Sequence, residues 1–296
     1  YRHGMNIRGE DYLKKFNFRG GEFGNYMNES DRLHSLNFGY DALLDLAHAL
    51  HIDPKDISLG GQLSIAFGAR GHGNALAHYE PNRTVINLTK MRGAGSLAHE
   101  WAHALDDYIA RKLNLPINSF ATDHYSSKIV SDKLPSLKKL MTTIKYGENE
   151  NSGLQFKKSV FYSNALEMDK NYSKEAHGYW SSNVEMFARV FACYIHDKLG
   201  YRSDYLCGHA YAGTLANDVC TYPRGKEMEN ISHCIDNLFT ELKTLEYVHE
   251  YTEPAITNDK KIEEKKTETI YDYDLHEESN GQFSLFDLED ERSMDY

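Results

Sequence analysis

Two histidines and a glutamate in the segment HEWAH carry the clearest chemical signal in this sequence. Residues four apart lie on one face of a helix, so His99 and His103 can bind one metal ion while Glu100 lies beside the open coordination position. Zinc with three protein ligands binds a water and lowers its pKa towards neutrality, and a neighbouring carboxylate can accept the water's proton as the water attacks a carbonyl. The spacing therefore predicts a zinc peptidase site with Glu100 as general base. The alternative is a structural helix that carries two ordinary histidines.

The third protein ligand must come from elsewhere in the chain. The position six residues after the second histidine is occupied by Ile109, which excludes the extended motif that has a third histidine there. Glu185 is the best candidate because Ala188 and Ala192 follow it on the same face of a predicted helix, where small side chains let two helices approach closely. The competing interpretation is a capping box, in which Ser182 and Glu185 satisfy backbone donors at the helix start.

Other polar residues are candidates for supporting roles around the metal. Asp106, one helical turn beyond His103, is expected to accept the free N–H of a ligand imidazole, with Asp107 as the alternative; a solvated acidic surface is the competing interpretation. Tyr179 is the preferred residue for a hydrogen bond to the oxyanion because it lies close to Glu185 in the sequence. The remaining candidates for that bond are His72, His78, Tyr79 and Tyr162.

The elements that must position these residues follow from the hydrophobic periodicity. Short apolar runs predict strands before the HEWAH segment, and the last two of these runs predict a hairpin. We therefore expect an α+β fold with a small, mostly antiparallel sheet. Between residues 115 and 180 we expect a surface excursion with one helix, at 136–144. The other predicted helices span residues 38–50, 93–113, 182–200 and 226–250, and the predicted strands 63–67, 75–80 and 84–89.

The composition divides the chain into three segments. Residues 1–36 are rich in Gly, Asn and charge and are predicted to be irregular, whereas residues 37–250 contain the predicted helices and strands. Residues 251–296 carry 14 acidic and 5 basic side chains, which is most of the formal net charge of −11. This last segment has too little apolar content to offset the entropy of ordering, so we expect an acidic, disordered tail.

The composition also argues against several classes of protein. No run approaches the roughly 18 apolar residues of a membrane span, and the first residues lack the apolar core of a signal peptide. We therefore expect a cytoplasmic protein without a membrane partner, and because the chain starts at Tyr1 rather than Met, a segment of a longer polypeptide. The cysteines form no CxxC pair and are expected to be reduced, partly buried thiols: Cys193, Cys207, Cys220 and Cys234.

A nucleic-acid partner is neither required nor excluded by the near-neutral charge of residues 1–250. A group of lysines could form a phosphate-binding face, although an ordinary solvated surface is the favoured interpretation. These are Lys128, Lys133, Lys138, Lys139, Lys145, Lys157 and Lys158.

A family resemblance covers the chain from about residue 18 to residue 198. It rests on FRGGEFGNYMN, NFGYDALLDLAHAL, ISLGGQLSIAFGARGHGNALAHYEPNRTVINLTK, GAGSLAHEWAHALDDY and SSNVEMFARVFACYI. Together these segments resemble the metallopeptidase domain (large polyvalent protein-associated domain, first type) of large polyvalent proteins of phages and conjugative elements. More distantly, HExxH followed by the ExxAxxFA pattern that begins at Glu185 is similar to antirestriction proteins and small gluzincin peptidases.

The resemblance implies a zincin-like (gluzincin) fold with a Zn²⁺ ion held by His99, His103 and Glu185, and Glu100 as the base. It also implies a mobile-element setting, in which such domains process polyprotein neighbours or act on host defence proteins inside the recipient cell. The family motif often has Gly before the second histidine; this chain has Ala102, whose extra methyl is not expected to disturb metal binding.

The acidic tail contains a second motif. Residues 282–286, QFSLF, resemble the short glutamine-led motif by which bacterial proteins dock on the DNA sliding clamp. An extended peptide can bury Leu285 and Phe286 in a groove while Gln282 makes a polar contact. The competing interpretation is an ordinary apolar patch.

Three functions remain compatible with the sequence. The leading hypothesis is a zinc endopeptidase of a mobile element that acts on a protein or peptide. The alternatives use the zinc fold only as a scaffold, either in an accessory protein bound to DNA or the sliding clamp, or in an antirestriction factor that binds without cleaving. The substrate, the cleavage specificity and the oligomeric state cannot be derived from the sequence.

Overall fold

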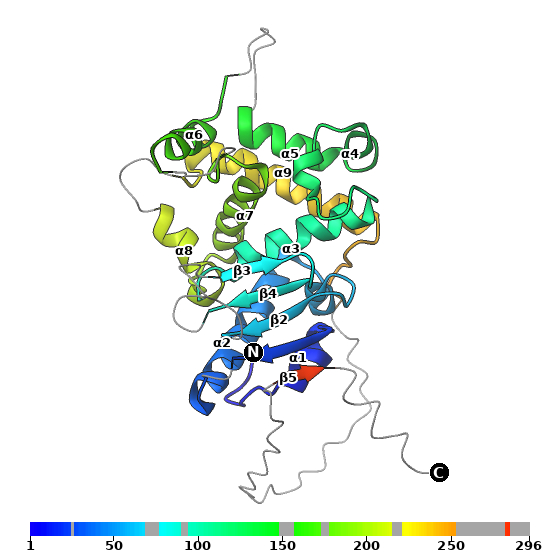
Figure 1. Ribbon diagram of the computed structural model, residues 1–296, viewed down its shortest axis with the longest axis vertical. Coiled ribbons are helices and arrows are strands. Elements are labelled where there is room, and N and C mark those ends of the chain that lie inside the picture. The colour runs from blue at the N-terminus through cyan, green and yellow to red at the C-terminus, as the bar shows by residue number, and fades with distance from the viewer. Residues whose placement is uncertain are drawn as a thin grey trace, which may run out of the picture.

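A computed structural model describes residues 1–24, 27–68, 77–89, 94–147, 157–172, 178–214, 221–252 and 282–284. Within these residues the fold is α+β: a small mixed sheet lies at one end of the molecule, and most helices pack above it (Figure 1). The strands are β1 (Gly20–Phe23), β2 (Ser64–Phe67), β3 (Ala77–Glu80), β4 (Val85–Leu88) and β5 (Gln282–Ser284).

The sheet has the order β3-β4-β2-β1-β5 and is not mostly antiparallel, so that prediction was wrong. Strands β3 and β4 form the predicted antiparallel hairpin, and β1 pairs with β5 antiparallel. The two central pairs, β1 with β2 and β2 with β4, are parallel. Parallel pairing needs a crossover connection, and the long helix α2 (Glu29–Leu50) supplies one between β1 and β2.

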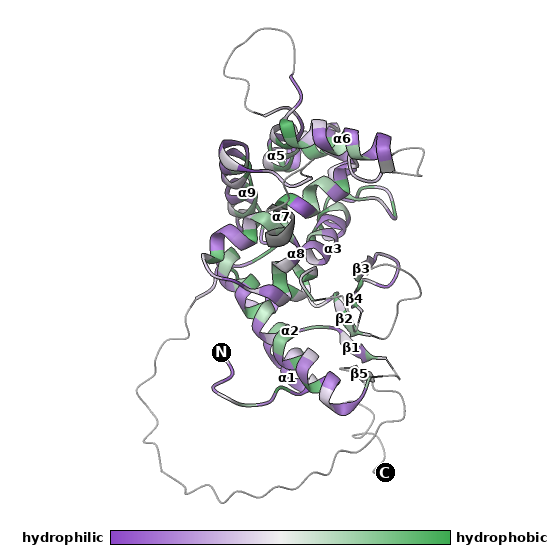
Figure 2. Ribbon diagram, turned by 90° about the vertical axis from the view of Figure 1, so that its left-hand side faces the viewer, coloured by the Kyte–Doolittle hydropathy of each residue, from purple (hydrophilic) through white to green (hydrophobic). Residues whose placement is uncertain are grey.

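Helices α1 (Gly9–Phe16) and α2 lie on the same side of the sheet (Figure 2). Gly39 on α2 allows a close approach, because a Cβ atom there would lie 3.2 Å from the ring of Phe67 on β2 and 2.6 Å from the hydroxyl of Tyr12 on α1. Tyr12 and Phe67 are both buried and pack edge to face. This contact joins the N-terminal helix, the long helix and the sheet into one core.

The prediction that residues 1–36 are irregular was wrong. Helix α1 buries Tyr12 and Phe16, strand β1 pairs with β2, and α2 already begins at Glu29, where the side chain of Asn28 caps the Asp31 amide. Glycine favours loops locally, but the Gly20 and Gly21 backbone is paired to a strand more than 40 residues away in the sequence. Local composition could not reveal that pairing.

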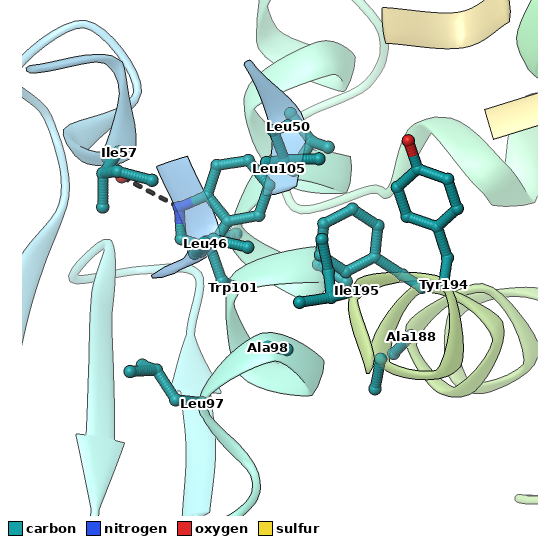
Figure 3. Packing of buried hydrophobic residues seen from close by; sticks show 14 of the residues in the cluster. Leu46, Leu50, Ile57, Leu97, Ala98, Trp101, Leu105, Ala188, Tyr194 and Ile195 are labelled. Atoms are coloured by element: carbon teal, nitrogen blue, oxygen red, sulfur yellow. Dashed lines mark hydrogen bonds between the residues drawn. The ribbon is translucent and has the colours of Figure 1, made fainter. Parts of the chain in front are cut away.

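The centre of the molecule is the contact between α3 (Leu97–Lys112) and α7 (Asn183–Leu199). Four buried alanines, Ala98, Ala102, Ala188 and Ala192, belong to these two helices. Beside them Trp101 stacks on Phe191 with ring centroids 5.5 Å apart, and its indole N–H donates to the Ile57 carbonyl at 2.9 Å (Figure 3). Small residues and one large aromatic pair thus set how close the two helices lie.

The region between α3 and α7 is more structured than the single predicted helix. Its helices are η2 (Ala121–His124), α4 (Lys128–Lys133), α5 (Pro135–Tyr146) and α6 (Val160–Tyr172). The expected surface excursion is wrong because α5 buries an apolar face against α9 (Gly225–Thr244). The remaining helices are η1 (Pro54–Ser58) and α8 (Asp204–Thr214), and α8 was not predicted because its glycine and alanine pattern is weak.

Three further expectations concern the tail, the membrane and the cysteines. Of the tail, residues 251 and 252 and strand β5 are described, and β5 is an ordered exception to the predicted disorder. Across the described residues, no helix combines the length and apolar character needed to span a membrane. Cys193, Cys207 and Cys234 are free, buried thiols as expected, whereas Cys220 lies outside the described residues.

We expect Ala188→Leu to test the close contact of α3 and α7. Ala188 is fully buried, so three extra carbons must force the helices apart, and overpacking of this kind costs about 1–3 kcal/mol. Chemical denaturation should show that loss in the free energy of unfolding. The matched control, Ile195→Leu on the same helix, conserves volume and should cost less than about 1.5 kcal/mol. Equal stability of Ala188→Leu and the parent chain would contradict a tight interface.

Candidate metal centre

Helices α3 and α7 bring two imidazoles and a carboxylate together. His99 and His103 are one turn apart on α3, and their Nε2 atoms face each other at 3.1 Å. Glu185, in the first turn of α7, places Oε2 3.4 Å from His99 Nε2 and Oε1 3.4 Å from His103 Nε2. Among the residues that the structure describes, this is the one group of three potential ligands whose donor atoms all lie within 4.8 Å of one another.

The start of α7 explains why the Glu185 carboxylate is available. Ser182 is the N-cap, and its hydroxyl accepts a hydrogen bond from the Glu185 backbone amide at 3.4 Å. The side chain of Glu185 does not turn back to the cap but points to the histidines on α3. Only half of the predicted capping box is therefore present: Ser182 caps the Glu185 amide, whereas the Ser182 amide donates to the Tyr179 carbonyl and the Glu185 carboxylate belongs to the candidate site.

These atoms fit a tetrahedral zinc ion. With bonds of about 2.0–2.1 Å, such an ion needs its ligand atoms about 3.3 Å apart, which is close to the 3.1 and 3.4 Å separations found here. Two neutral imidazoles and a carboxylate are one of the ligand sets found in catalytic zinc sites. Three protein ligands would leave the fourth position for water, so the residues present fit the group.

The electrostatics of the metal-free site show how strongly the three residues interact. Burial opposes the charged form of His103, but the hydrogen bond and charge of Glu185, with the charges of Glu100 and Asp106, outweigh burial and raise its pKa. Burial would raise the pKa of Glu185, yet hydrogen bonds from His103 and His99 hold it well below its usual value. The carboxylate thus stays ionised, as a metal ligand must be.

Glu100 lies beside the three ligands and is nearly buried, with 6% of its surface exposed. Its charge raises the pKa of both His103 and Tyr179, so it acts on both sides of the candidate site. A buried carboxylate next to an open metal position can accept a proton from a bound water. The location agrees with the role expected of a general base.

Asp106 and Asp107 have partners other than the histidines. Asp106 accepts the Thr122 amide at 2.8 Å and also the Thr122 hydroxyl, and Asp107 accepts the Tyr79 hydroxyl at 2.6 Å. Both acids are buried, so a solvated acidic surface is wrong as well. The structure thus does not give Asp106 the imidazole bond expected of it, because η2 presents Thr122 to both of its oxygens. Within the described residues, His103 Nδ1 is buried without a hydrogen-bond partner.

Tyr179 lies at the site. Burial raises its pKa, and so does the charge of the nearby Glu185 carboxylate, although 42% of the residue's surface is exposed. The other candidates for the oxyanion bond have different contacts. The Tyr79 hydroxyl is taken by Asp107, Tyr162 packs on Lys145 and Tyr146, and His78 Nε2 lies 3.2 Å from Glu80. His72 lies outside the described residues.

His209 on α8 is a polar residue near the site that the sequence did not indicate. Its Nδ1 lies 2.7 Å from the hydroxyl of Ser96, the residue just before α3, and its amide donates to the Gly95 carbonyl at 3.2 Å. Burial lowers the pKa of His209, and so does the charge of His99 when protonated. The only sequence signal was a histidine in a weakly helical segment, more than 100 residues from the HEWAH motif.

The remaining predicted binding residues lie apart from the histidines. Gln282 begins β5 on the far edge of the sheet, and Leu285 and Phe286 lie outside the described residues. Lys145 is half-buried between Tyr125 and Tyr162 and donates to Asn183, so its ammonium already has partners within the chain. The other six lysines of that group are exposed.

Comparison with known protein families gives one match. Residues 171–246, about a quarter of the chain, match the family model of large polyvalent protein-associated domain 1. This confirms the expected family resemblance for a segment that includes Tyr179, Glu185 and His209. The match begins after α3, so it says nothing of His99, Glu100 and His103. Comparisons with curated proteins and with solved structures give no match.

Glu185→Gln should weaken zinc binding by at least about a hundredfold, because loss of a charged ligand exceeds the cost of losing a supporting residue. The helix should remain capped, since Ser182 bonds the backbone amide of residue 185. Competition with a zinc-binding dye measures the affinity, and Asp197→Asn, an exposed acid on the same helix, is the matched control. Equal zinc affinity in both variants would reduce Glu185 to a capping residue.

Burial raises the pKa of Asp106 to about 7 in the metal-free protein, despite its bonds to Thr122. A raised folded-state pKa gives stability that is full below the unfolded value near 4 and is lost as the pH rises through about 7. Asp106→Asn, which keeps polar atoms for Thr122, should therefore be more stable than the parent at pH 8 by over about 1 kcal/mol. Denaturation at pH 5 and pH 8 measures this difference. If the difference in the free energy of unfolding between Asp106→Asn and the parent did not grow from pH 5 to pH 8, Asp106 could not be a buried carboxyl with a raised pKa.

Proposed function

We propose that this chain, which contains a match to large polyvalent protein-associated domain 1, is a zinc-dependent endopeptidase with a zincin-like site of the gluzincin type. The observation that carries the proposal is the triangle of His99 Nε2, His103 Nε2 and the Glu185 carboxylate, whose edges suit one zinc ion. A buried Glu100 beside this triangle supplies the base that a hydrolase needs. His99 and His103 would hold the ion as neutral imidazoles, and Glu185 would hold it as a carboxylate.

Bound zinc would supply an acidified water and a polarised substrate carbonyl. The chain performs the proton transfers. Glu100 accepts the proton of the attacking water and later delivers it to the leaving amine, a role that suits a carboxylate held close to the ligands by the first turn of α3. Its burial keeps bulk water from competing for that proton.

Tyr179 is the proposed donor to the oxyanion. Its raised pKa means that the phenol keeps its proton at neutral pH, so it can donate a hydrogen bond as negative charge develops on the substrate oxygen. In the metal-free protein the phenol lies close enough to the Glu185 carboxylate for that carboxylate to raise its pKa. Sharing the charge of Glu185 with bound zinc would favour a hydrogen bond from the phenol to the substrate oxygen.

The proposed substrate is an extended segment of a protein. In the described sheet, β3 is the terminal strand, it pairs with β4 on one side, and it packs against α3. A strand at the end of a sheet can add an extended peptide through backbone hydrogen bonds. A peptide aligned in this way would run past the helix that carries His99 and His103.

The proposed setting is the cytoplasm of a cell that carries or receives a mobile element of the phage or conjugative type. Support comes from the match to large polyvalent protein-associated domain 1 and from the sequence resemblance. The substrates in that setting would be neighbouring segments of a polyvalent protein or host defence proteins.

A second candidate is a binding protein that uses the zinc fold as a scaffold, either at the sliding clamp or as an antirestriction factor. The observation that favours it is the extended backbone of Gln282–Ser284 at the start of the clamp-like motif. An extended strand is the form in which a short peptide enters a groove on a partner.

Glu100→Gln separates the two candidates. The variant removes the general base but no metal ligand, so peptide hydrolysis should fall by about 10²–10⁴-fold while zinc affinity stays within about twofold of the parent. Cleavage of a casein or peptide-library substrate by the zinc-loaded full chain measures the activity. Wild-type activity in Glu100→Gln would overturn the peptidase mechanism. A wild-type chain that binds zinc but cleaves nothing would favour the scaffold.

A further inference from the structure

The short segment that carries Tyr179 is held in place from two sides. We call residues 178–182 the Tyr179 loop; it ends at the N-cap of α7, three residues before Glu185. Helix α6 contributes Asp169 to one side of this loop, and helix α7 contributes Arg189 to the other. Neither side chain belongs to the candidate metal ligands, and the proposed reaction gives neither of them a chemical step.

The Asp169 carboxylate accepts hydrogen bonds from backbone amides of the Tyr179 loop. Its Oδ1 accepts the Trp180 N–H at 2.7 Å, and its Oδ2 accepts the Ser181 N–H at 2.8 Å. The Tyr179 amide and the Ser181 hydroxyl also lie near this carboxylate and favour its charged form. Burial opposes its charge, but these hydrogen bonds outweigh burial and lower the pKa of Asp169. An ionised carboxylate that accepts several amides makes strong, directional bonds.

Gly178 allows this arrangement. Its φ angle is +74°, a left-handed backbone conformation that residues other than glycine rarely adopt. A Cβ atom at this position would also overlap the carboxylate of Asp169. The backbone conformation therefore favours glycine where the loop begins its turn, and a Cβ atom there would displace the Asp169 carboxylate that accepts the loop amides.

Arg189 binds the carbonyl side of the loop. Its guanidinium donates to the carbonyls of Trp180, of Glu185 at 3.2 Å and of Thr221 at 2.7 Å. The group is 2% exposed and lies over the rings of Trp180, at 5.3 Å, and Phe161, at 5.2 Å. Burying a guanidinium costs desolvation free energy. We therefore expect this contact to be retained because it stabilises the loop or serves its function.

We infer that Asp169 and Arg189 are positioning residues that fix Tyr179 at the metal site, the first through the loop amides and the second through the Trp180 carbonyl. This inference rests on the proposed function. A preorganised donor to an oxyanion is worth about 10²–10³-fold in rate, and a misplacement of about 1 Å can lose most of that. Tyr179 is followed directly by Trp180, so a shift of the Trp180 backbone that Asp169 and Arg189 hold also moves the Tyr179 phenol.

A purely structural role for Asp169 makes a different prediction. If the carboxylate only stabilised the fold, its loss would affect zinc binding, KM and kcat without reference to Tyr179. If it acts through Tyr179, its effect should vanish once the phenol hydroxyl is absent. A double-mutant cycle between the two residues therefore distinguishes the roles.

The first test is amide hydrogen exchange in the metal-free full chain. Asp169→Ala should speed exchange of the Trp180 and Ser181 amides by at least about tenfold, while Glu167→Gln, an exposed acid on the same helix, should change neither. Asp169→Asn is the milder variant should Asp169→Ala fail to fold. Unchanged protection of both amides would show that Asp169 does not fix the Tyr179 loop, and would overturn the inference whether or not the chain is a peptidase.

The second test is kinetic. Asp169→Asn should lower kcat by about tenfold, with KM and zinc affinity within about twofold of the parent. Combined with Tyr179→Phe, it should add nothing to the loss caused by Tyr179→Phe alone. Full additivity of the two losses would overturn the inference. If the parent chain hydrolyses no peptide although the amide result holds, the proposed function fails while the fixing of the Tyr179 loop by Asp169 stands. The two failures are therefore distinguishable.

Discussion

The contact between α3 and α7 is the constraint on which the candidate site depends. Four alanines let the helices approach, and the stack of Trp101 on Phe191 keeps them in register. Only at this separation can a carboxylate on the first turn of α7 lie 3.4 Å from both imidazoles on α3. Strands β3 and β4 pack against α3, α2 packs against α7, and α5 and α9 pack above α7 (Figure 1), so the surrounding elements hold this helix pair in place.

This geometry concentrates buried charge. Glu185 and Glu100 are acidic groups in or beside a largely apolar core, Asp106 joins them as the pH rises through about 7, and each of these charges raises the pKa of His103. Buried charges cost stability unless they are paired or bind a metal. In the metal-free protein the histidines and Thr122 provide the pairing. A divalent cation would neutralise the cluster better, so metal binding and stability should be linked.

The sequence predicted the parts of the site that obey short-range rules. The HEWAH spacing, the Ser182 cap and the alanines after Glu185 are local patterns, and each corresponds to a helix of the structure. The sequence-based predictions failed where the interacting residues are far apart in the sequence. The parallel pairing of β1 with β2, the bonds of Thr122 to Asp106 and the place of His209 beside Ser96 all depend on the completed fold. None has a periodic or capping signature, so pattern reasoning could not have found them.

The central claim is that α3 and α7 together form a zinc site with nitrogen and oxygen ligands. X-ray absorption at the zinc edge of the zinc-loaded full chain tests it most directly. The account predicts about four light ligands at roughly 2.0–2.1 Å, with the multiple scattering of two imidazoles and no sulfur. Sulfur at about 2.3 Å, or a shell of oxygen atoms without imidazole, would contradict it, because the metal would then lie away from His99, His103 and Glu185.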